Sequence, residues 1–224
     1  RAVIRSCEIR ETPLQGFTGF TIKPSDDNGE TTAMISPDIA VCSECKKETG
    51  DENDRRYRYP FTNCTNCGPR FTIIKALPYD RAMTTMAKFT MCPECQAEFD
   101  DPLNRRFHAQ PNACPICGPR ITLVDSNGVP VDREIRDLLK SGYIVAVKGL
   151  GGFHLAANAL DAAAVMRLRQ RKRRDAKPFA VMVRDLATAH QHCIINSGEE
   201  ALLASPAAPI VVLKRREDSP LPAE

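Results

Sequence analysis

The sequence predicts an α+β protein in which two small zinc-binding repeats, each with four cysteines, precede an α/β unit. Three observations predict this fold class: four C-x-x-C pairs, a duplication of the segment that holds them, and a change after Asp125 to alternating helical and strand-like segments. The chain has 224 residues, enough for one large domain or two modest ones. We expect a segment of a longer protein, because the first stretch, RAVIRSCEIRE, has no initiator Met and no apolar signal region.

The paired cysteines predict two metal sites. They are Cys42, Cys45, Cys64 and Cys67, followed by Cys92, Cys95, Cys114 and Cys117. Each set reads C-x2-C-x18-C-x2-C, and four thiolates satisfy tetrahedral Zn²⁺ without leaving an open position. Two structural zinc ions are therefore predicted. Cysteine pairs on this spacing favour metal over disulfides and indicate a reducing compartment, the cytoplasm.

The second set of cysteines repeats the first with an offset of fifty residues. The phrase NCTNCGPRFTI at residues 63–73 returns as ACPICGPRITL at residues 113–123, and two arginines at 55–56 return at 105–106. This is an internal duplication of one structural unit. Duplication favours zinc ligands drawn from one repeat, although an exchange of pairs between repeats stays open. The repeated arginines could offset the formal charge of about −2 on each tetrathiolate site.

Two smaller features of the repeats also invite a structural interpretation. A glycine follows the last cysteine of each repeat, at Gly68 and Gly118, and suits a turn whose N–H groups point at thiolate sulfur. His108 lies between the cysteine pairs of the second repeat, but its counterpart, Arg58, cannot bind a metal. We therefore expect His108 to make surface or hydrogen-bonding contacts.

The net charge does not indicate a polyanionic partner. It is +3 with neutral thiols, and zinc ligation would remove thiol protons and bring the charge close to zero. No apolar run approaches the roughly 20 residues of a membrane helix. We expect no membrane association and no nucleic-acid partner from bulk composition. Cys7 and Cys193 have no partner motif and are expected to be free thiols.

The second half begins after a turn-rich linker, DSNGVPVD, at residues 125–132. Asp132 can cap a helix that buries Leu138 and ends at Gly142. The run YIVAV at residues 143–147 then predicts a buried strand.

Further helices and strands are predicted towards the C-terminus. A helix is expected from Asp161 to about Arg173, with Leu168 on its buried face. PFAVMV at residues 178–183 and PIVVL at residues 209–213 predict two more buried strands. Helices that alternate with apolar strands indicate an α/β unit.

Two features of this half could carry chemistry. In KGLGG, residues 148–152, glycine N–H groups and a lysine could bind an anion, although a plain turn between strands is an equally good interpretation. The basic run RLRQRKRRDAKP, residues 167–178, fits a solvated helix end, a nucleic-acid patch or a pocket that clamps a small triphosphate.

The chain contains four stretches that match a known pattern: CSECKKETGDENDRRYRYPFTNCTNCGPRFTI, CPECQAEFDDPLNRRFHAQPNACPICGPR, VAVKGLGGFHLAANA and RDAKPFAVMV. They resemble the hydrogenase maturation carbamoyltransferases of the HypF family. The resemblance implies the tail of an acylphosphatase-like domain at residues 1–24 and a duplicated zinc-finger region at 38–123, with repeats at about 42–72 and 92–122. It implies the N-terminal part of a YrdC-like α/β twisted-sheet domain at 130–224.

The resemblance also implies an activity. Members of the family use carbamoyl phosphate and ATP, with Mg²⁺, to form carbamoyl-adenylate. They transfer the carbamoyl group to the C-terminal cysteine of HypE, which dehydrates it towards the cyanide ligand of NiFe hydrogenase. The parent protein is thus expected to be an enzyme. The 224 residues alone are not expected to turn over substrate, since the family's further domains are missing from them.

Binding residues are implied on this sequence as well. Those expected to contact ATP or carbamoyl phosphate are Lys148, His154, Lys172, Arg174 and Lys177. Transfer of AMP creates charge on phosphate oxygens, which fixed cations stabilise. No catalytic residue is assigned. The alternative is a non-catalytic zinc-ribbon module that binds nucleic acid or a protein partner through RQRKRR. Few aromatic residues accompany that run, which weighs against base stacking.

Overall fold

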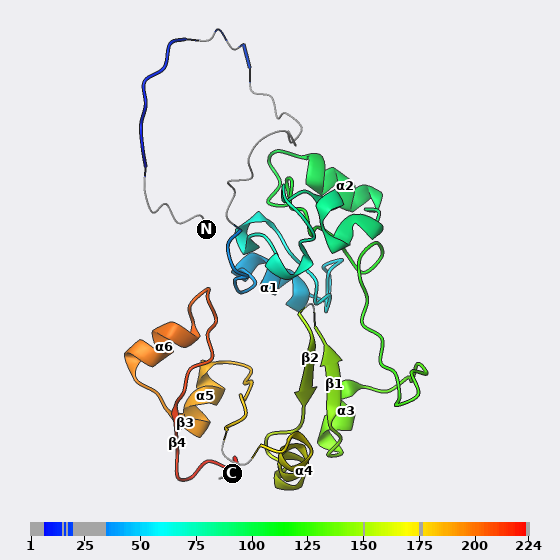
Figure 1. Cartoon of the computed structure of the whole chain (residues 1–224), viewed down its shortest axis with the longest axis vertical. Coiled ribbons are helices and arrows are strands. Elements are labelled where there is room, and N and C mark those ends of the chain that lie inside the picture. The colour runs from blue at the N-terminus through cyan, green and yellow to red at the C-terminus, as the bar shows by residue number, and fades with distance from the viewer. Residues whose placement is uncertain are drawn as a thin grey trace. The chain divides into compact units, whose positions relative to one another are not determined.

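The computed structural model contains two compact units. The described residues are 7–14, 16, 18–19, 35–149, 151–174 and 177–222. The chain divides into unit 1, Arg1–Pro119, and unit 2, Arg120–Glu224 (Figure 1). The acylphosphatase-like tail expected at residues 1–24 falls largely outside the described residues, as do Leu150 of the glycine stretch and Asp175 of the basic run.

Unit 1 holds two equivalent helices, each beginning directly after the first cysteine of a repeat. Helix α1 spans Ser43–Gly50 and α2 spans Pro93–Asp100, fifty residues later. Cys42 and Cys92 occupy the N-cap positions in extended backbone, and Pro93 suits the first helical position because no N–H is needed there. Both helices are too short to persist on helix propensity alone, so tertiary contacts must hold them.

The rest of unit 1 consists of loops and short 3₁₀ helices. These are η1 (Thr65–Cys67), η2 (Phe71–Ile73), η3 (Arg81–Met83) and η4 (Thr85–Lys88). A small apolar cluster joins the repeats, because Tyr59, Ile73 and Met86 of the first half pack with Ala113 of the second. Most other buried side chains are cysteine, arginine, asparagine and threonine, so the interior of unit 1 is mainly polar.

Unit 2 begins with a helix and a β-hairpin. Helix α3 spans Ile135–Lys140, strand β1 spans Val145–Lys148 and strand β2 spans Phe153–Ala156. The strands pair antiparallel over all four residues, and the Gly149 N–H donates to the Gly152 carbonyl at 2.8 Å. Gly152 has a φ of 147°, which glycine adopts readily. Gly149 and Gly152 therefore belong to the turn that connects β1 to β2.

Helix α4, Ala162–Lys172, comes after the hairpin, and its bounds agree closely with the helix predicted from Asp161 to about Arg173. The Asp161 carboxylate accepts a hydrogen bond from the Ala164 N–H at 3.0 Å and caps the helix. Ala164 and Leu168 are buried on one face. Arg173, at a φ of 49°, ends the helix in the left-handed conformation.

Two more helices and two short strands complete unit 2. They are α5 (Leu186–His192), β3 (Cys193–Ile194), α6 (Ser197–Leu203) and β4 (Lys214–Arg215). Asp185 caps α5 through the Thr188 N–H, and Asn196 forms a capping box with Glu199 at the start of α6. Strands β3 and β4 pair antiparallel.

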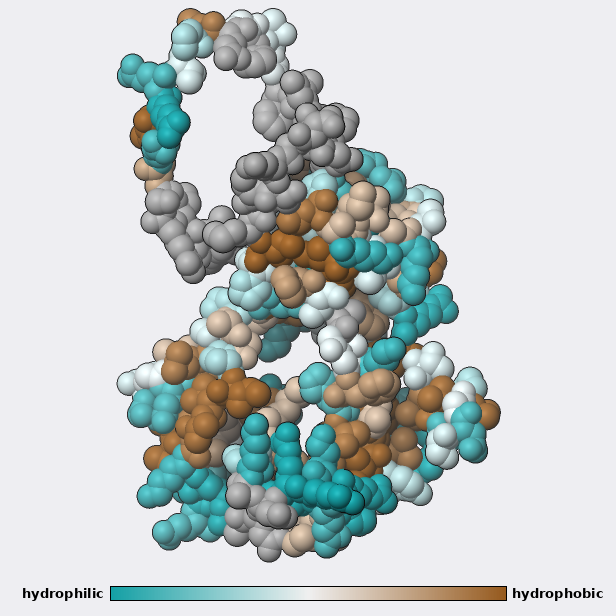
Figure 2. Space-filling model, in the orientation of Figure 1, coloured by the Kyte–Doolittle hydropathy of each residue, from teal (hydrophilic) through white to brown (hydrophobic). Residues whose placement is uncertain are grey.

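Two segments predicted as buried strands are not strands in this structure. Residues 178–183 and 209–213 have no sheet partner within the described part of the chain. Met182 is 97% exposed, and Ile210 and Val212 are 83% and 89% exposed. An apolar run becomes a buried strand only where a neighbouring strand pairs its N–H and C=O groups, and hydrophobicity does not reveal whether that neighbour is present. Figure 2 shows apolar residues gathered on the part of unit 2 that holds α5 and α6.

The start of unit 2 also differs from prediction. The predicted cap at Asp132 is wrong, since α3 has Glu134 at its N-cap without a side-chain bond to the helix. Leu138 is buried and Gly142 follows the helix with a φ of 79°, both as predicted. Residues 145–147 of the run YIVAV lie in β1, whereas Tyr143 and Ile144 precede the strand, and only Val145 of this strand is buried. The hairpin is therefore more exposed than its sequence indicates.

Candidate metal centres and anion-binding residues

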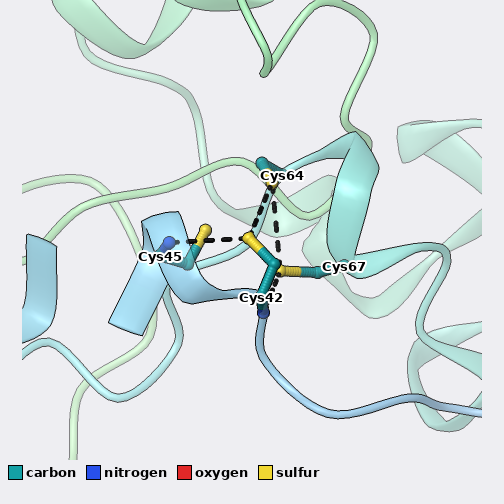
Figure 3. Close-up of side chains that lie close together, drawn as sticks. All are labelled: Cys42, Cys45, Cys64 and Cys67. Carbon is teal, nitrogen blue, oxygen red and sulfur yellow. Dashed lines mark hydrogen bonds between the residues drawn. The ribbon is translucent and has the colours of Figure 1, made fainter. Parts of the chain in front are cut away.

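The cysteines of the first repeat place their sulfur atoms in one cluster (Figure 3). The Sγ atoms of Cys42, Cys45, Cys64 and Cys67 all lie within 4.8 Å of one another. Cys42 Sγ is 3.6 Å from Cys64 Sγ, which is 3.9 Å from Cys67 Sγ. A disulfide would require about 2.05 Å, so these are four free thiols.

The second repeat forms an equivalent cluster. Its ligand set is Cys92, Cys95, Cys114 and Cys117. Three of the separations between its sulfur atoms are 3.6 to 3.8 Å. Zinc–sulfur bonds of about 2.3 Å in tetrahedral geometry separate the sulfurs by about 3.8 Å. Both clusters therefore fit Zn²⁺, and each cluster forms within one repeat.

Backbone N–H groups near the start of α1 point at sulfur. The Cys45 N–H donates to Cys42 Sγ at 3.5 Å, and the Cys42 N–H donates to Cys67 Sγ at 3.3 Å. The N–H groups of Gly68 and Gly118 themselves each donate to a backbone carbonyl of the preceding turn. In the first repeat, the N–H groups of Cys42 and Cys45 are thus donors to sulfur.

The repeated arginines reach the metal site of the opposite repeat. Arg55 Nη2 lies 3.2 Å from Cys95 Sγ, and Arg105 Nη1 lies 2.9 Å from Cys45 Sγ. Arg56 Nη2 also approaches Cys95 Sγ, at 3.5 Å. All three of these contacts cross from one repeat to the other. The sequence indicated that these cations could offset thiolate charge but carried no signal that they cross between repeats.

Glu98 on α2 holds the arginines that reach the second site. Arg55 Nη2 and Arg56 Nη1 each donate to its carboxylate at 2.9 Å. Arg56 is 2% exposed, and its Nε also donates to the Ala113 carbonyl at 3.0 Å. Burial alone would raise the pKa of Glu98, but the neighbouring arginines outweigh it and lower the pKa to about 2.

Glu48 on α1 plays the same part at the first site. It forms ion pairs with Arg105 and Arg106, and the Arg106 Nε donates to the Asn63 carbonyl at 3.2 Å. Burial raises the pKa of Glu48, but these arginines bring it below its ordinary value. Arg106 Nη1 also lies 3.6 Å from Glu98 Oε1, so the two charge networks are joined.

His108 lies outside the group of sulfur ligands. Its ring stacks on Phe99 with 5.0 Å between centroids and meets Phe107 edge-on at 4.5 Å. Its φ of 51° matches the 56° of Arg58, the residue fifty positions earlier. His108 is therefore an aromatic packing residue at an equivalent backbone position in the repeat.

Lys148 and His154 flank the hairpin turn of unit 2. Both are exposed, and Lys148 Nζ lies 5.7 Å from the centroid of the Phe153 ring. Lys148 pairs across the strands with Phe153, whereas His154 pairs with Val147. Because cross-strand partners share a face and successive residues alternate, the two side chains leave opposite faces of the hairpin.

Lys172, Arg174 and Lys177 lie at the C-terminal end of α4. Arg169, which the sequence did not single out, fixes this segment by donating from Nη1 to the carbonyls of Arg174 at 2.9 Å and Lys177 at 3.3 Å. Its guanidinium also lies 4.8 Å from the centroid of the Phe179 ring. The only sequence signal for Arg169 was its place in the basic run.

The two groups of expected contact residues remain separate in the described residues, where no hydrogen bond or ion pair joins them. A hollow of about 360 Å³ beside α4 is lined by Ser141, Gly142, Tyr143, Ile144, Arg167 and Arg171, and so by none of the five expected ligand contacts. Arg167 donates to the Gly142 carbonyl there. Part of the basic run therefore has intramolecular partners.

Protein-family comparisons match both units. The HypF finger family matches residues 41–74 and 91–124, and the Sua5/YciO/YrdC family, described as telomere recombination, matches residues 137–224. Curated relatives extend over nearly the whole chain. The carbamoyltransferase HypF of Synechocystis sp. is 54% identical over 221 residues, which are 96% of this chain and 29% of the relative.

The chain belongs to the HypF family. Further HypF relatives agree: carbamoyltransferase HypF2 of Cupriavidus necator is 56% identical over 88% of this chain and 25% of its own length. The probable carbamoyltransferase HypF of Methanocaldococcus jannaschii is 48% identical over 89% of this chain and 26% of its own length. The chain therefore spans less than a third of the HypF relatives it matches.

Solved HypF structures share the fold. A crystal structure of full-length HypF in the phosphate- and nucleotide-bound form matches with a TM-score of 0.74 and 53% identity, over 83% of this chain and 25% of that one. HypF of T. kodakarensis matches with a TM-score of 0.77 and 45% identity, over 86% of this chain and 26% of that one. The predicted fold class is confirmed. In the described part of the chain, no helix is long and apolar enough to cross a membrane.

Proposed function

We propose that this chain is part of a carbamoyltransferase that forms carbamoyl-adenylate from carbamoyl phosphate and ATP. The enzyme passes the carbamoyl group to the C-terminal cysteine of HypE, for the cyanide ligand of NiFe hydrogenase. The observation that carries this proposal is the 54% identity to the Synechocystis carbamoyltransferase over 96% of the chain. Because the chain spans 29% of that relative, the reaction belongs to the whole protein.

The cations of unit 2 suit the adenylation step. Water first cleaves carbamoyl phosphate to carbamate and inorganic phosphate. A carbamate oxygen then forms a bond to the α-phosphorus of ATP while the bond to pyrophosphate breaks, and negative charge grows on the pyrophosphate that leaves. Fixed cations stabilise that charge, and Mg²⁺ would accompany the nucleotide and help to neutralise its phosphates. Lys172, Arg174 and Lys177 are candidates because Arg169 anchors the backbone on which two of them sit.

The hairpin would supply a second group of contacts. Lys148 and His154 leave opposite faces, so a ligand contacts both only if it straddles the edge of the turn. The Gly149 N–H already donates to the Gly152 carbonyl, so the N–H groups of Gly151 and Gly152 are the candidate donors for an anion at that edge. We therefore assign Lys148 to phosphate or carbamate oxygens and His154 to the neighbouring wall.

The zinc sites have a structural part in this proposal. Four sulfur ligands leave no open coordination position for substrate. The zinc region would hold its neighbouring domains in register, while substrate chemistry takes place on the YrdC-like portion.

The test is Lys172→Ala in the full-length enzyme. We expect carbamoyl-phosphate-dependent ATP–pyrophosphate exchange to fall by roughly 100-fold, because a fixed cation is lost where charge develops. Zinc content should not change. Arg171→Ala, one residue earlier on the same helix and also exposed, is the matched control and should retain activity. Wild-type exchange in Lys172→Ala would remove Lys172 from the site.

A nucleic-acid-binding zinc module is the second candidate. It is favoured by the exposed side chains of Arg171, Lys172 and Arg173. This function predicts nucleic-acid affinity that falls steeply with salt, together with no exchange activity in the full-length protein. Specific ATP binding without such affinity would support the carbamoyltransferase instead.

A further inference from the structure

The crossed arginines supply each buried thiolate cluster with cations from the other repeat. Cys45 and Cys95 are both fully buried, and each accepts from an arginine of the opposite repeat at 2.9 Å and 3.2 Å. A zinc ion bound by four thiolates keeps a formal charge of about −2. Burying that charge is costly unless hydrogen-bonding cations lie beside it. Arg105 and Arg55 are those cations.

The arginines are placed by the loop between the cysteine pairs of their own repeat. In the first repeat, the Arg56 N–H donates to the Asp54 carboxylate at 2.7 Å, and the Arg58 N–H reaches the Thr49 carbonyl at 2.9 Å. In the second repeat, the Arg106 N–H donates to the Asn104 side-chain oxygen at 3.0 Å, and the His108 N–H donates to the Phe99 carbonyl at 3.0 Å. A zinc ion that joins Cys45 to Cys64 closes this loop, so metal in one repeat fixes the arginines that the other repeat needs.

The backbone adds a further connection between the repeats. The N–H and the hydroxyl of Thr65, next to Cys64 in the first site, both donate to the Arg105 carbonyl, at 3.0 Å and 2.9 Å. Arg105 therefore contacts the first site through its guanidinium and through its main chain. Its position is sensitive to the state of both repeats.

We infer that the two zinc sites bind metal cooperatively, with Arg55 and Arg105 as the residues that couple them. Each site reaches full affinity only when the other repeat is folded around its own zinc. The effect is reciprocal, because a coupling free energy between two sites acts equally in both directions.

The first experiment measures zinc affinity at each site separately. Arg105→Gln and Arg55→Gln are made in the 224-residue chain, zinc is withdrawn by a chelator, and alkylation followed by mass spectrometry reports which cysteines become exposed. Loss of a residue that supports metal ligands typically costs roughly 10- to 100-fold in metal affinity. We expect Arg105→Gln to weaken the first site by about 10-fold and the second much less, and Arg55→Gln to do the reverse.

Two variants serve as controls. Arg58→Gln, in the same loop as Arg55 but exposed and in contact with the Tyr57 ring, should leave both sites unchanged. Arg105→Lys keeps the charge and should restore part of the affinity that Arg105→Gln loses at the first site. A substitution that merely damaged the second repeat would show no such rescue and would expose the second set of cysteines first.

The second experiment counts bound zinc by native mass spectrometry during a titration of the metal-free chain. Coupled sites predict that the one-zinc species stays below its binomial population at half saturation. A binomial population of that species overturns the proposal. In the first experiment, the proposal is also overturned if zinc affinity falls only at the site of the repeat that carries the substituted arginine, or if it falls at neither site.

Discussion

The interiors of units 1 and 2 are stabilised by different kinds of residue. Unit 1 encloses thiols, amides and charges, and Arg56 and Arg106 are only 2% and 3% exposed. Unit 2 buries a few apolar residues and leaves others, such as Met182 and Val212, almost fully exposed. The difference shows that a short stretch of chain can supply all the partners of a metal-site and ion-pair network. An apolar strand, by contrast, is buried only where other strands or helices pack against it.

The exposed apolar segments of unit 2 have the residue types of buried strands, but they do not form a sheet. Val181, Met182, Ile210 and Val212 follow the pattern of buried strands but lack strand partners in the described chain. This chain corresponds to 29% of the Synechocystis HypF relative. We expect the longer protein to cover these segments, because an apolar patch of this kind is otherwise unusual on a soluble surface.

The largest effect in this comparison is expected from loss of zinc. Cys64→Ser removes a ligand of the first site and should release its zinc and unfold the first repeat, since apparent zinc-binding free energies in small zinc domains reach about 10 kcal/mol and are coupled to folding. The α4 region of unit 2 should keep its structure. Metal analysis with limited proteolysis measures both results. Unchanged metal content would contradict the site, and simultaneous loss of unit 2 would break the contrast between the units.

A smaller effect is expected from the buried charges of unit 1. Arg56→Met leaves the Ala113 carbonyl unbonded and deprives Glu98 of a buried partner, which should cost about 3 kcal/mol of unfolding free energy. Denaturant unfolding of the zinc-loaded chain measures it. Arg58→Met, at an exposed position, should change stability by less than about 0.5 kcal/mol. Equal costs at both positions would show that the polar interior does not stabilise unit 1.

The smallest effects are expected from the apolar residues of unit 2. Leu168→Ala, on the buried face of α4, should cost about 2 kcal/mol, at the low end for such a substitution because the core is small. Met182→Ala should stay within about 0.5 kcal/mol because its side chain is 97% exposed. Thermal unfolding of the two variants gives the comparison. A large loss in Met182→Ala would mean that this segment is covered in solution.

Features written locally in the sequence were predictable. The C-x-x-C spacing identified both sulfur clusters because helix starts and short turns bring such pairs together without help from distant residues. Helix α4 was predicted closely, since the Asp161 cap and a stripe through Leu168 are local signals.

Features that depend on distant partners were not predictable. The arginines at 55–56 and 105–106 have the same spacing to their own cysteines, and nothing in that spacing says which site they face. Arg169 donates hydrogen bonds to the carbonyls of Arg174 and Lys177. The sequence could not predict this role, because Arg169 is one of several similar basic residues in the same run. The two predicted apolar strands were wrong for the same reason, because strand pairing depends on whether a second strand lies beside the segment.

The exchange of arginines has a consequence for the symmetry of unit 1. Arg55 pairs with Glu98, and Arg105 pairs with Glu48, so each repeat gives the other the same contact that it receives. Reciprocal pairing of this kind is the rule of an isologous, twofold interface between identical subunits. The two repeats of unit 1 thus contact each other as the subunits of a twofold dimer do, although they belong to one chain. Cutting the linker between them would give two incomplete subunits rather than two independent zinc fingers.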